Sequence, residues 1–167
     1  MSTAVLMQPI TSHIVTMLKQ RSTELRKGRY SHPGYVYMTT IVTHQRERHF
    51  AEWKIGRLVC HEMKQLHDLD EVNSLAWVIM PEHCHWLFQL RNIELARCML
   101  KFKSRSALAL NHHLQRSGRI WQPGYYERAM RSDDEVKQAA RYIIDNPVRR
   151  GLVNKIHDYP LWDAVWV

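Results

Sequence analysis

The chain has 167 residues, of which 45% are hydrophobic and 24% are charged, so it is long enough to bury a core without disulfides or a structural metal. Its 3 cysteines, Cys60, Cys84 and Cys98, form no Cys-x-x-Cys pair, which argues against a disulfide framework or a cysteine zinc site and favours a cytoplasmic protein. No segment approaches the roughly 20 apolar residues that span a bilayer. Residues 1–9 lack the pattern of a secretory signal, and no membrane partner is expected.

Residues 1–28 are predicted to form an N-terminal extension ahead of a domain over residues 29–167. Apolar residues recur in the extension at helical spacing from Ile10 to Leu25, which predicts a helix. The run Ser-His-Pro-Gly at 31–34 then marks a turn. The role of the extension is open between extra contacts with a partner and simple packing.

The first half of the domain is predicted to contain strands and one helix. β-Branched and aromatic residues predict a strand over 35–43, and apolar positions at helical spacing predict a helix over 50–69. Two further strands are predicted over 74–80 and 83–90, with a tight connection at residues 81–82.

The second half is predicted to contain a long helix over 93–114, a short strand over 125–130 and a last helix. Ser132 and Glu135 form a capping box that begins the last helix. Pro147 is expected to end it, because a residue before proline is pushed out of helical geometry. The order of elements is therefore β-α-β-β-α-β-α. Its first six elements match an α+β, ferredoxin-like sheet with both helices on one face, followed by a C-terminal helix.

Basic residues dominate the charge of the chain, with a formal net charge of +8 and a sequence pI of about 9.6. This balance favours a polyanionic partner, because lysine and arginine release counterions from nucleic acid phosphates. A generic solvated surface is the alternative. Several basic patches have an aromatic residue nearby, which suits a surface that binds phosphates and stacks on bases. The patches lie at residues 19–21, 26–29, 101–105 and 149–150.

Two histidines, His83 and His85, lie in the third predicted strand. Residues i and i+2 of a strand point to the same face, so both imidazoles would project together, as metal ligation needs, while Cys84 would point into the core. With 11 histidines in the chain, about one His-x-His is expected by chance, and a hydrogen-bonded or surface pair is the alternative. A central strand is a rigid platform, which favours the metal site. The rings of the adjacent His112 and His113 are expected to diverge, so this pair is interpreted as structural or surface residues.

Tyr142 and Asn146 lie four residues apart in the last predicted helix and therefore on one face. A tyrosine hydroxyl can attack phosphorus when a metal polarises the phosphate, and an asparagine oxygen can complete a metal site beside two histidines. The alternative is that Tyr142 is a core aromatic and that Asn146 before Pro147 is a simple helix stop. The acidic Glu82 and Asp145 are expected to be solvated.

Three blocks of sequence together resemble the HUH single-tyrosine transposases of bacterial insertion sequences. The first block is Trp-Val-Ile-Met-Pro-Glu-His-Cys-His over 77–85. The other two, Ile-Trp-Gln-Pro-Gly-Tyr-Tyr-Glu over 120–127 and Tyr-Ile-Ile-Asp-Asn-Pro-Val-Arg-Arg-Gly-Leu-Val over 142–153, are similar to the REP-associated tyrosine transposases within that group. The blocks occur in the family's order, and the resemblance covers about residues 29–162.

The resemblance implies that the domain over residues 29–167 is a HUH single-tyrosine transposase domain with a ferredoxin-like fold, in agreement with the predicted order of elements. It implies that His83 and His85 bind the metal and that Tyr142 is the nucleophile. Asn146 falls at the position of a third metal ligand, where many relatives carry glutamine. The implied cofactor is Mg²⁺ or Mn²⁺. The implied activity is cleavage and rejoining of single-stranded DNA beside hairpins such as the REP palindromes, through a 5′-phosphotyrosine.

A further set of residues is predicted to contact DNA through a positive charge or an aromatic ring, with a core position as an equal alternative for each aromatic one. They are Arg29, Lys101, Lys103, Arg105, Trp121, Tyr125, Tyr126, Arg128, Arg149 and Arg150.

Two other functions fit the same residues. A non-catalytic protein that binds single-stranded DNA or RNA hairpins could use the same fold, since ferredoxin-like sheets also serve as nucleic acid platforms. A metal hydrolase with an activated water would be expected to bring more carboxylates near His83. The sequence leaves open whether the protein acts as a monomer or a homodimer, and which group accepts the proton of Tyr142.

Overall fold

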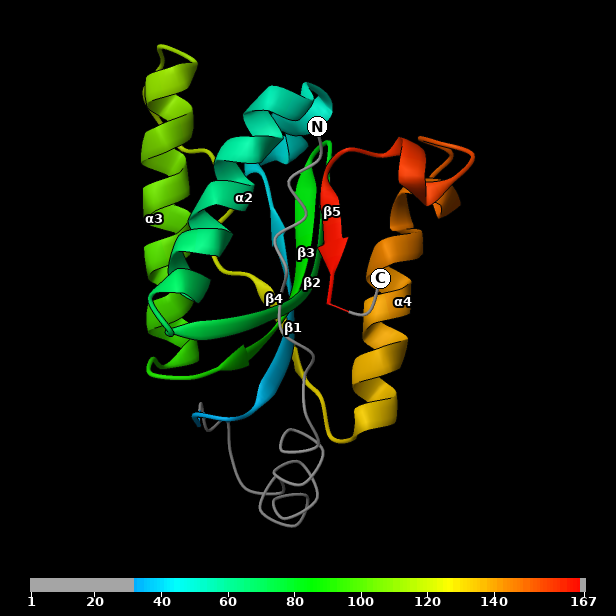
Figure 1. The fold of residues 1–167 in the computed structure, drawn as a ribbon. Helices are drawn as coiled ribbons and strands as arrows, with labels where there is room; N and C mark the ends of the chain where they lie inside the picture. The colour runs from blue at the N-terminus through cyan, green and yellow to red at the C-terminus, as the bar shows by residue number, and fades with distance from the viewer. Residues whose placement is uncertain (1–31, 166–167) are drawn as a thin grey trace.

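The structure is a computed structural model that describes residues 32–165, so the predicted N-terminal helix and Arg29 lie outside the described residues. A 5-stranded sheet in the order β4-β1-β3-β2-β5, with all neighbours antiparallel, forms its centre (Figure 1). The strands are β1 (Val36–Val42), β2 (Val72–Met80), β3 (His83–Leu90), β4 (Tyr126–Ala129) and β5 (Trp162–Ala164). The helices are α2 (Trp53–Asp68), α3 (Leu95–His113) and α4 (Asp133–Arg149), with short 3-10 turns η1 (His44–Arg46), η2 (His49–Ala51) and η3 (Ile156–Asp158). Within this described part, no helix is long and apolar enough to cross a membrane.

The predicted ferredoxin-like arrangement is confirmed. Four strands take the order β4-β1-β3-β2, α2 and α3 cover one face of the sheet, and α4 covers the other (Figure 1). β2 and β3 are joined only by Pro81 and Glu82, so they pair as an antiparallel hairpin. β1 and β4 reach their neighbours through longer connections that contain the helices.

Strand β3 lies in the middle of the sheet, and all of its residues are buried because both faces are covered. Alternation along the strand sends Cys84 and Trp86 into the core under α2 and α3, as predicted for Cys84. The same alternation sends His83 and His85 to the face that α4 covers, in line with Leu87, which packs there. The two histidines therefore occupy interior positions that apolar side chains usually fill.

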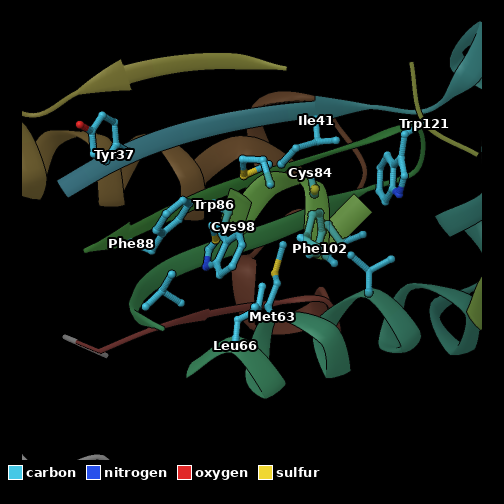
Figure 2. Close-up of a cluster of buried hydrophobic side chains, with 14 of the residues drawn as sticks. Tyr37, Ile41, Met63, Leu66, Cys84, Trp86, Phe88, Cys98, Phe102 and Trp121 are labelled. Atoms are coloured by element: carbon cyan, nitrogen blue, oxygen red, sulfur yellow. The ribbon is translucent and has the colours of Figure 1, made fainter. Parts of the chain in front are cut away.

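The core under α2 and α3 combines aromatic rings with aliphatic and sulfur-containing side chains (Figure 2). The ring centroids of Trp86 and Phe88 lie 4.3 Å apart, and those of Trp86 and Phe102 lie 5.4 Å apart. Burial of each such side chain contributes roughly 1.5–3 kcal/mol. Trp86 Nε1 donates a hydrogen bond of 2.9 Å to Ser74 Oγ, so its polar edge is also satisfied. This packed layer holds β3 in place on the face of the sheet that α2 and α3 cover.

Helix α2 closely approaches the segment before β5 at Gly56, where an added Cβ atom would overlap Leu161 Cδ1. Because Leu161 is buried, we expect Gly56→Ala to destabilise the fold by about 1 kcal/mol. Overpacking costs roughly 1–3 kcal/mol, and the better helix propensity of alanine offsets about 1 kcal/mol of it. Urea unfolding measures the difference. In a Leu161→Ala background the same change should be neutral or stabilising, and an equal loss in both backgrounds would contradict the overlap.

The N-terminal end of α4 is capped as predicted. Ser132 Oγ accepts a hydrogen bond of 3.2 Å from Glu135 N. The Glu135 carboxylate reaches back to Arg131 N at 3.0 Å rather than to the backbone of Ser132. The helix then packs on the sheet through Val136 and Ala140, which fixes its position over β2 and β3.

The prediction that Pro147 ends α4 is wrong, because the helix continues through Pro147 to Arg149. Proline lacks an N–H group, but this close to the C-terminal end it removes only one helical hydrogen bond. Gly151 sets the end instead, at φ 67° in the left-handed region. Gly151 N donates to Val148 O and Leu152 N donates to Pro147 O, both at 2.9 Å, which is a Schellman ending.

The sequence pattern did not predict β5. This strand has only 3 residues and pairs with the outer edge of β2. A strand so short shows no period of its own. The Tyr159 hydroxyl donates a hydrogen bond of 2.6 Å to Ile79 O, which anchors the segment leading to it.

Candidate active site

His83 and His85 lie side by side on the face of β3 that α4 covers, as the strand period predicts. Their ring centroids are 4.8 Å apart and their planes meet at 80°. Only 4% of His83 and 7% of His85 is exposed, which excludes the surface alternative. His83 directly follows the Pro81-Glu82 connection, so the pair lies at the end of the sheet where β2 turns into β3.

Each imidazole has one nitrogen committed to a neighbour. Glu82 Oε1 lies 3.1 Å from His83 Nδ1, and Thr40 Oγ1 lies 2.8 Å from His85 Nδ1. An ionised carboxylate can only accept, so His83 Nδ1 donates to Glu82. The Thr40 hydroxyl can accept from His85 Nδ1 in the same way. Both rings then present an Nε2 lone pair, and a second partner of this kind is typical of metal-binding histidines.

The expectation that Glu82 is solvated is wrong, because its carboxylate pairs with His83 and its side chain is only 19% exposed. Its adjacency to His83 in the sequence was the available signal. Asp145 is exposed, as expected, and of the two interpretations of His112 and His113 their exposure supports the surface one.

Both imidazoles are held in the uncharged form. Burial, with contributions from His83 and Arg150, lowers the pKa of His85 to about 3. Burial also lowers the pKa of His83 against the opposing effect of Glu82, and the charges of Arg150 and Arg46 act in the same direction as burial. A neutral imidazole is the form that coordinates a metal.

Tyr142 faces His85 from α4, with the two ring centroids 5.6 Å apart. The guanidinium carbon of Arg149 lies 5.0 Å from the centroid of the same phenol ring, within cation–π range. The tyrosine is 41% exposed, which excludes the alternative of a core aromatic. Its ring is thus held by two neighbours while the side chain stays open to solvent.

Asn146 lies one helical turn after Tyr142 and one turn before Arg150, on the same stretch of α4. Only 4% of its surface is exposed. Within residues 32–165, its side-chain amide makes no hydrogen bond. Its amide is not among the fully buried polar atoms that lack a partner, so it keeps some contact with solvent and its oxygen is available to a ligand.

These residues fit a divalent metal ion. The donors available to such an ion would be one imidazole nitrogen each of His83 and His85 and the amide oxygen of Asn146. A mixed nitrogen and oxygen set suits Mn²⁺ better than Mg²⁺, which prefers oxygen alone. No group of three or more His, Cys, Asp or Glu side chains that could hold a metal occurs among the described residues. Water or a substrate oxygen would therefore fill the remaining positions.

A groove of about 440 Å³ runs past the tyrosine between β4 and α4. Thr40 and Tyr126 line its strand side, and Gln138 and Tyr142 line its helix side. His85 of β3 also lines the groove. Tyr126 is 72% exposed. The groove thus combines the tyrosine and histidine with an open aromatic ring of the kind on which bases stack.

Of the predicted DNA contacts, the structure brings Tyr126, Arg128, Arg149 and Arg150 to this region. Tyr126 and Arg128 line the groove, and Arg149 stacks on Tyr142. Arg150 caps the C-terminal end of α4, close enough for its charge to act on both histidines.

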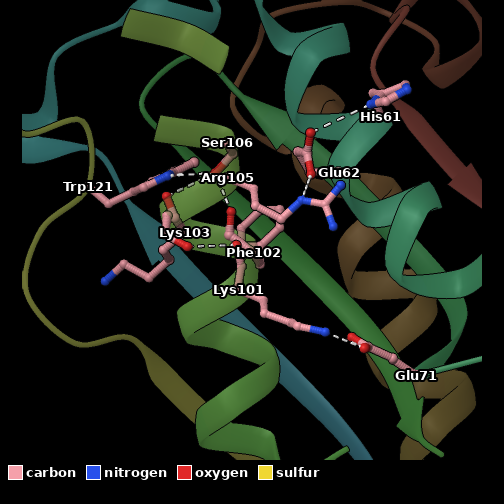
Figure 3. A network of polar contacts seen from close by, with 10 residues as sticks. His61, Glu62, Glu71, Lys101, Phe102, Lys103, Arg105, Ser106 and Trp121 are labelled. Carbon is pink, nitrogen blue, oxygen red and sulfur yellow. Dashed lines mark hydrogen bonds and ion pairs between the residues drawn. The ribbon is translucent and has the colours of Figure 1, made fainter. Parts of the chain in front are cut away.

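Lys101, Lys103 and Arg105 are not brought to the histidines but join α3 to its neighbours, as Figure 3 shows for Lys101 and Arg105. Lys101 pairs with Glu71, and Arg105 Nε lies 2.8 Å from Glu62 Oε2. Lys103 Nζ donates to two backbone carbonyls of the loop before β4, at 2.7 and 2.6 Å. These charges are committed to the side of the sheet that faces away from α4.

The structure corrects the expectation that Trp121 stacks on bases, because only 4% of this residue is exposed. Its ring centroid lies 5.5 Å from that of Phe50 and 5.9 Å from that of Phe102. Its Nε1 donates a hydrogen bond of 3.0 Å to Ser106 Oγ (Figure 3). Tyr125 packs, partly buried, against the same core. For Trp121 the core alternative is therefore correct.

Sequence reasoning missed Thr40, which is the Cα partner of His85 in the β1–β3 ladder. A threonine in a β-branched strand has no distinguishing pattern, and it lies 45 residues from its partner. Only the register of β1 against β3 brings the two together. Only knowledge of this strand pairing could have identified Thr40 as the partner of His85.

Comparison with known families assigns the chain to a class of transposases. A family model described as "Transposase IS200 like" matches residues 31–146, a span that contains His83, His85, Tyr142 and Asn146. The chain belongs to this family.

Two curated proteins are similar to the chain, and both are described as REP-associated tyrosine transposases. The chain is 33% identical over 92 residues to the REP-associated tyrosine transposase of Escherichia coli (strain K12), which covers 54% of this chain and 52% of that protein. It is 28% identical over 138 residues to a candidate REP-associated tyrosine transposase of Haemophilus influenzae, covering 76% of this chain and 78% of that protein. The alignment thus spans about half the length of the Escherichia coli relative.

Two solved structures share the fold. One is a REP-associated tyrosine transposase bound to a REP hairpin, with a TM-score of 0.68 and 23% identity, covering 82% of this chain and 81% of that one. The other is a candidate transposase from Deinococcus radiodurans, with a TM-score of 0.50 and 19% identity, covering 71% of this chain and 95% of that one.

Proposed function

We propose that this protein is a metal-dependent endonuclease and strand transferase that cuts single-stranded DNA beside hairpin palindromes. The observation that carries the proposal is the position of Tyr142, an accessible phenol whose ring lies against His85 in an open groove. The neutral, paired histidines support it, as does Asn146, whose side-chain amide makes no hydrogen bond within residues 32–165.

Tyr142 acts as the nucleophile. Its phenolic oxygen attacks the phosphorus of a phosphodiester, forming an O–P bond as the bond to the 3′-oxygen breaks. The phenolic proton leaves, and the departing 3′-oxygen gains a proton to become a hydroxyl. Because the 5′-phosphotyrosine is itself a phosphodiester, a 3′-hydroxyl of another strand end can reverse the step and join the strands. His85 and Arg149 hold the ring in place for both steps.

His83, His85 and Asn146 would hold the metal ion. When bound, Mg²⁺ or Mn²⁺ supplies positive charge that makes the phosphate a better electrophile. The chain's own contribution is to keep both imidazoles neutral and oriented, through burial, Glu82 and Thr40.

The groove would take the single-stranded DNA next to the cut. Tyr126 offers a face on which a base can stack, a contact worth roughly 1–3 kcal/mol. The structural relative was solved with a REP hairpin bound. We propose a hairpin of the same kind as the substrate here, with its single-stranded flank in the groove.

Removal of the partner of His85 should weaken the metal site without removing a ligand. We expect Thr40→Val to raise the Mn²⁺ concentration needed for half-maximal cleavage by about 10-fold or more, because a partner of a metal-binding histidine typically contributes 10–100-fold in affinity. Titration of cleavage with Mn²⁺ measures this. Thr39→Val is the matched control, since Thr39 is the neighbouring residue of β1 and bonds to Trp86 O instead. An equal Mn²⁺ requirement in both variants would show that Thr40 does not orient His85.

One assay tests the proposed function. The protein is incubated with an end-labelled single-stranded oligonucleotide that carries a palindromic hairpin with randomised flanks, in Mg²⁺, Mn²⁺ or EDTA. The products are resolved on a denaturing gel. We expect a metal-dependent covalent DNA–protein band, and peptide mapping should place the DNA on Tyr142. Metal-dependent cutting without an adduct would favour a hydrolase that uses water. Hairpin binding without any cutting would favour a non-catalytic binding protein.

A further inference from the structure

The turn after β1 is strained. Gln45 and Arg46 are consecutive non-glycine residues with φ of 52° and 55°, in the left-handed region that such residues rarely adopt. Strained residues of this kind persist only where the surroundings hold them, and they concentrate at functional sites. Here the turn is closed by Thr43 Oγ1, which donates to Glu47 O at 2.7 Å, and Arg116 Nη1 lies 2.9 Å from Glu47 Oε2.

This turn lies against the histidine pair. Thr43 N donates to Glu82 O at 3.0 Å, Thr43 Oγ1 lies 2.9 Å from the same oxygen, and Glu82 directly precedes His83. The C-terminal end of α4 lies at the same end of the sheet (Figure 1). Arg46 from the turn and Arg150 from α4 therefore approach the histidines from two different elements, and the charges of both act on His83.

Both arginines are available to a ligand. Arg46 and Arg150 are exposed, and neither makes a side-chain ion pair or hydrogen bond to another residue in the range 32–165. The nearby Glu82 carboxylate is already committed to His83. The histidines are uncharged, and Arg46 and Arg150 are the positively charged groups that act on His83.

We propose that Arg46 and Arg150 together bind a phosphate of the DNA strand where it passes over His83 and His85. This inference rests on the proposed function and adds Arg46 to its substrate-binding residues. A guanidinium group can bind phosphate oxygens through two parallel hydrogen bonds, but only if it is held in a fixed position. The strained turn provides that position, because it fixes the backbone of Arg46 beside Glu82.

The left-handed backbone at Arg46 allows one substitution to remove the side chain without a cost to the fold. Glycine adopts a φ of 55° without cost, so Arg46→Gly should leave the melting temperature unchanged or raise it. The same variant should cut DNA about 10–100-fold more slowly, because a charged hydrogen bond to phosphate is lost. Arg46→Lys keeps the charge but not the paired hydrogen bonds, so its cleavage rate should lie between that of the wild type and that of Arg46→Gly. Arg48→Gln removes the same charge two residues later and serves as the matched control.

A binding measurement separates this proposal from the proposed function. Affinity for a labelled single-stranded hairpin oligonucleotide is measured in EDTA at several salt concentrations. Loss of one phosphate contact should reduce the slope of log affinity against log salt by about 0.7 in Arg46→Gly and leave it unchanged in Arg48→Gln. An unchanged slope in Arg46→Gly, or a lower melting temperature with normal binding, would overturn the role of Arg46. If the wild-type protein binds but never cuts, the proposed function fails while the slopes still decide on Arg46.

Discussion

Tyr142→Phe is expected to eliminate the covalent DNA–protein product and to slow strand cleavage by roughly a thousandfold or more, because the variant lacks the only oxygen of the proposed nucleophile. Hairpin affinity should stay within about twofold, since the ring and its contacts with His85 and Arg149 remain. The fold should also be unaffected, because the residue is 41% exposed. Single-turnover cleavage on a denaturing gel, together with a binding titration, measures both quantities.

Tyr126→Phe is the matched control for this change. Tyr126 lines the same groove and is more exposed than Tyr142, so its variant removes a phenol hydroxyl from the same surface. The ring that can stack on a base is kept, and cleavage should remain close to that of the wild type. If Tyr142→Phe still forms the adduct and Tyr126→Phe does not, the nucleophile has been assigned to the wrong tyrosine.

His85→Gln is expected to lower cleavage by roughly a hundredfold or more and to abolish detectable Mn²⁺ binding, because it removes one of the two imidazole donors. Glutamine keeps a polar group that can bond to Thr40, which limits the damage to folding from an unpaired buried hydroxyl. Calorimetric titration with Mn²⁺ measures the binding, and the wild-type protein in EDTA should reproduce the loss of cleavage.

His113→Gln serves as the control, because His113 is exposed at the end of α3. It should bind Mn²⁺ and cut DNA as the wild type does. A His85→Gln protein that binds Mn²⁺ normally but does not cut would mean that His85 acts on the DNA rather than on the metal. That result would require a different set of metal ligands.

Local rules were sufficient to predict most of the fold and the central pair of the site. The two-residue period of a strand placed His83 and His85 on one face and Cys84 on the other, and the structure confirms both. The N-cap at Ser132 also depends on a local contact, between its side chain and one backbone N–H group three residues later. These features depend on residues that are close together in the sequence.

The features that sequence reasoning missed depend on tertiary contacts. Thr40 reaches His85 only through the register of β1 against β3. The short strand β5 exists because the edge of β2 is free to pair. Pro147 was expected to end α4, but its position in the last turns makes the loss of a single hydrogen bond tolerable, and Gly151 ends the helix instead. Trp121 is equally plausible from its sequence as a core residue or a DNA contact, and only its packing against Phe102 decides.

The contact between Tyr142 and His85 also limits the order in which strands can be cut and joined. Both residues belong to one chain, so under the proposed chemistry a single copy of the protein would hold the nucleophile and the histidines for one cut. Under the proposed chemistry that copy has one nucleophile and can carry only one 5′ end at a time. Joining must then be sequential: the first 3′ end has to vacate the groove before the second can enter it. The lifetime of the cut intermediate would therefore be set by how fast strands exchange in the groove, and a slow exchange would favour resealing of the original strand.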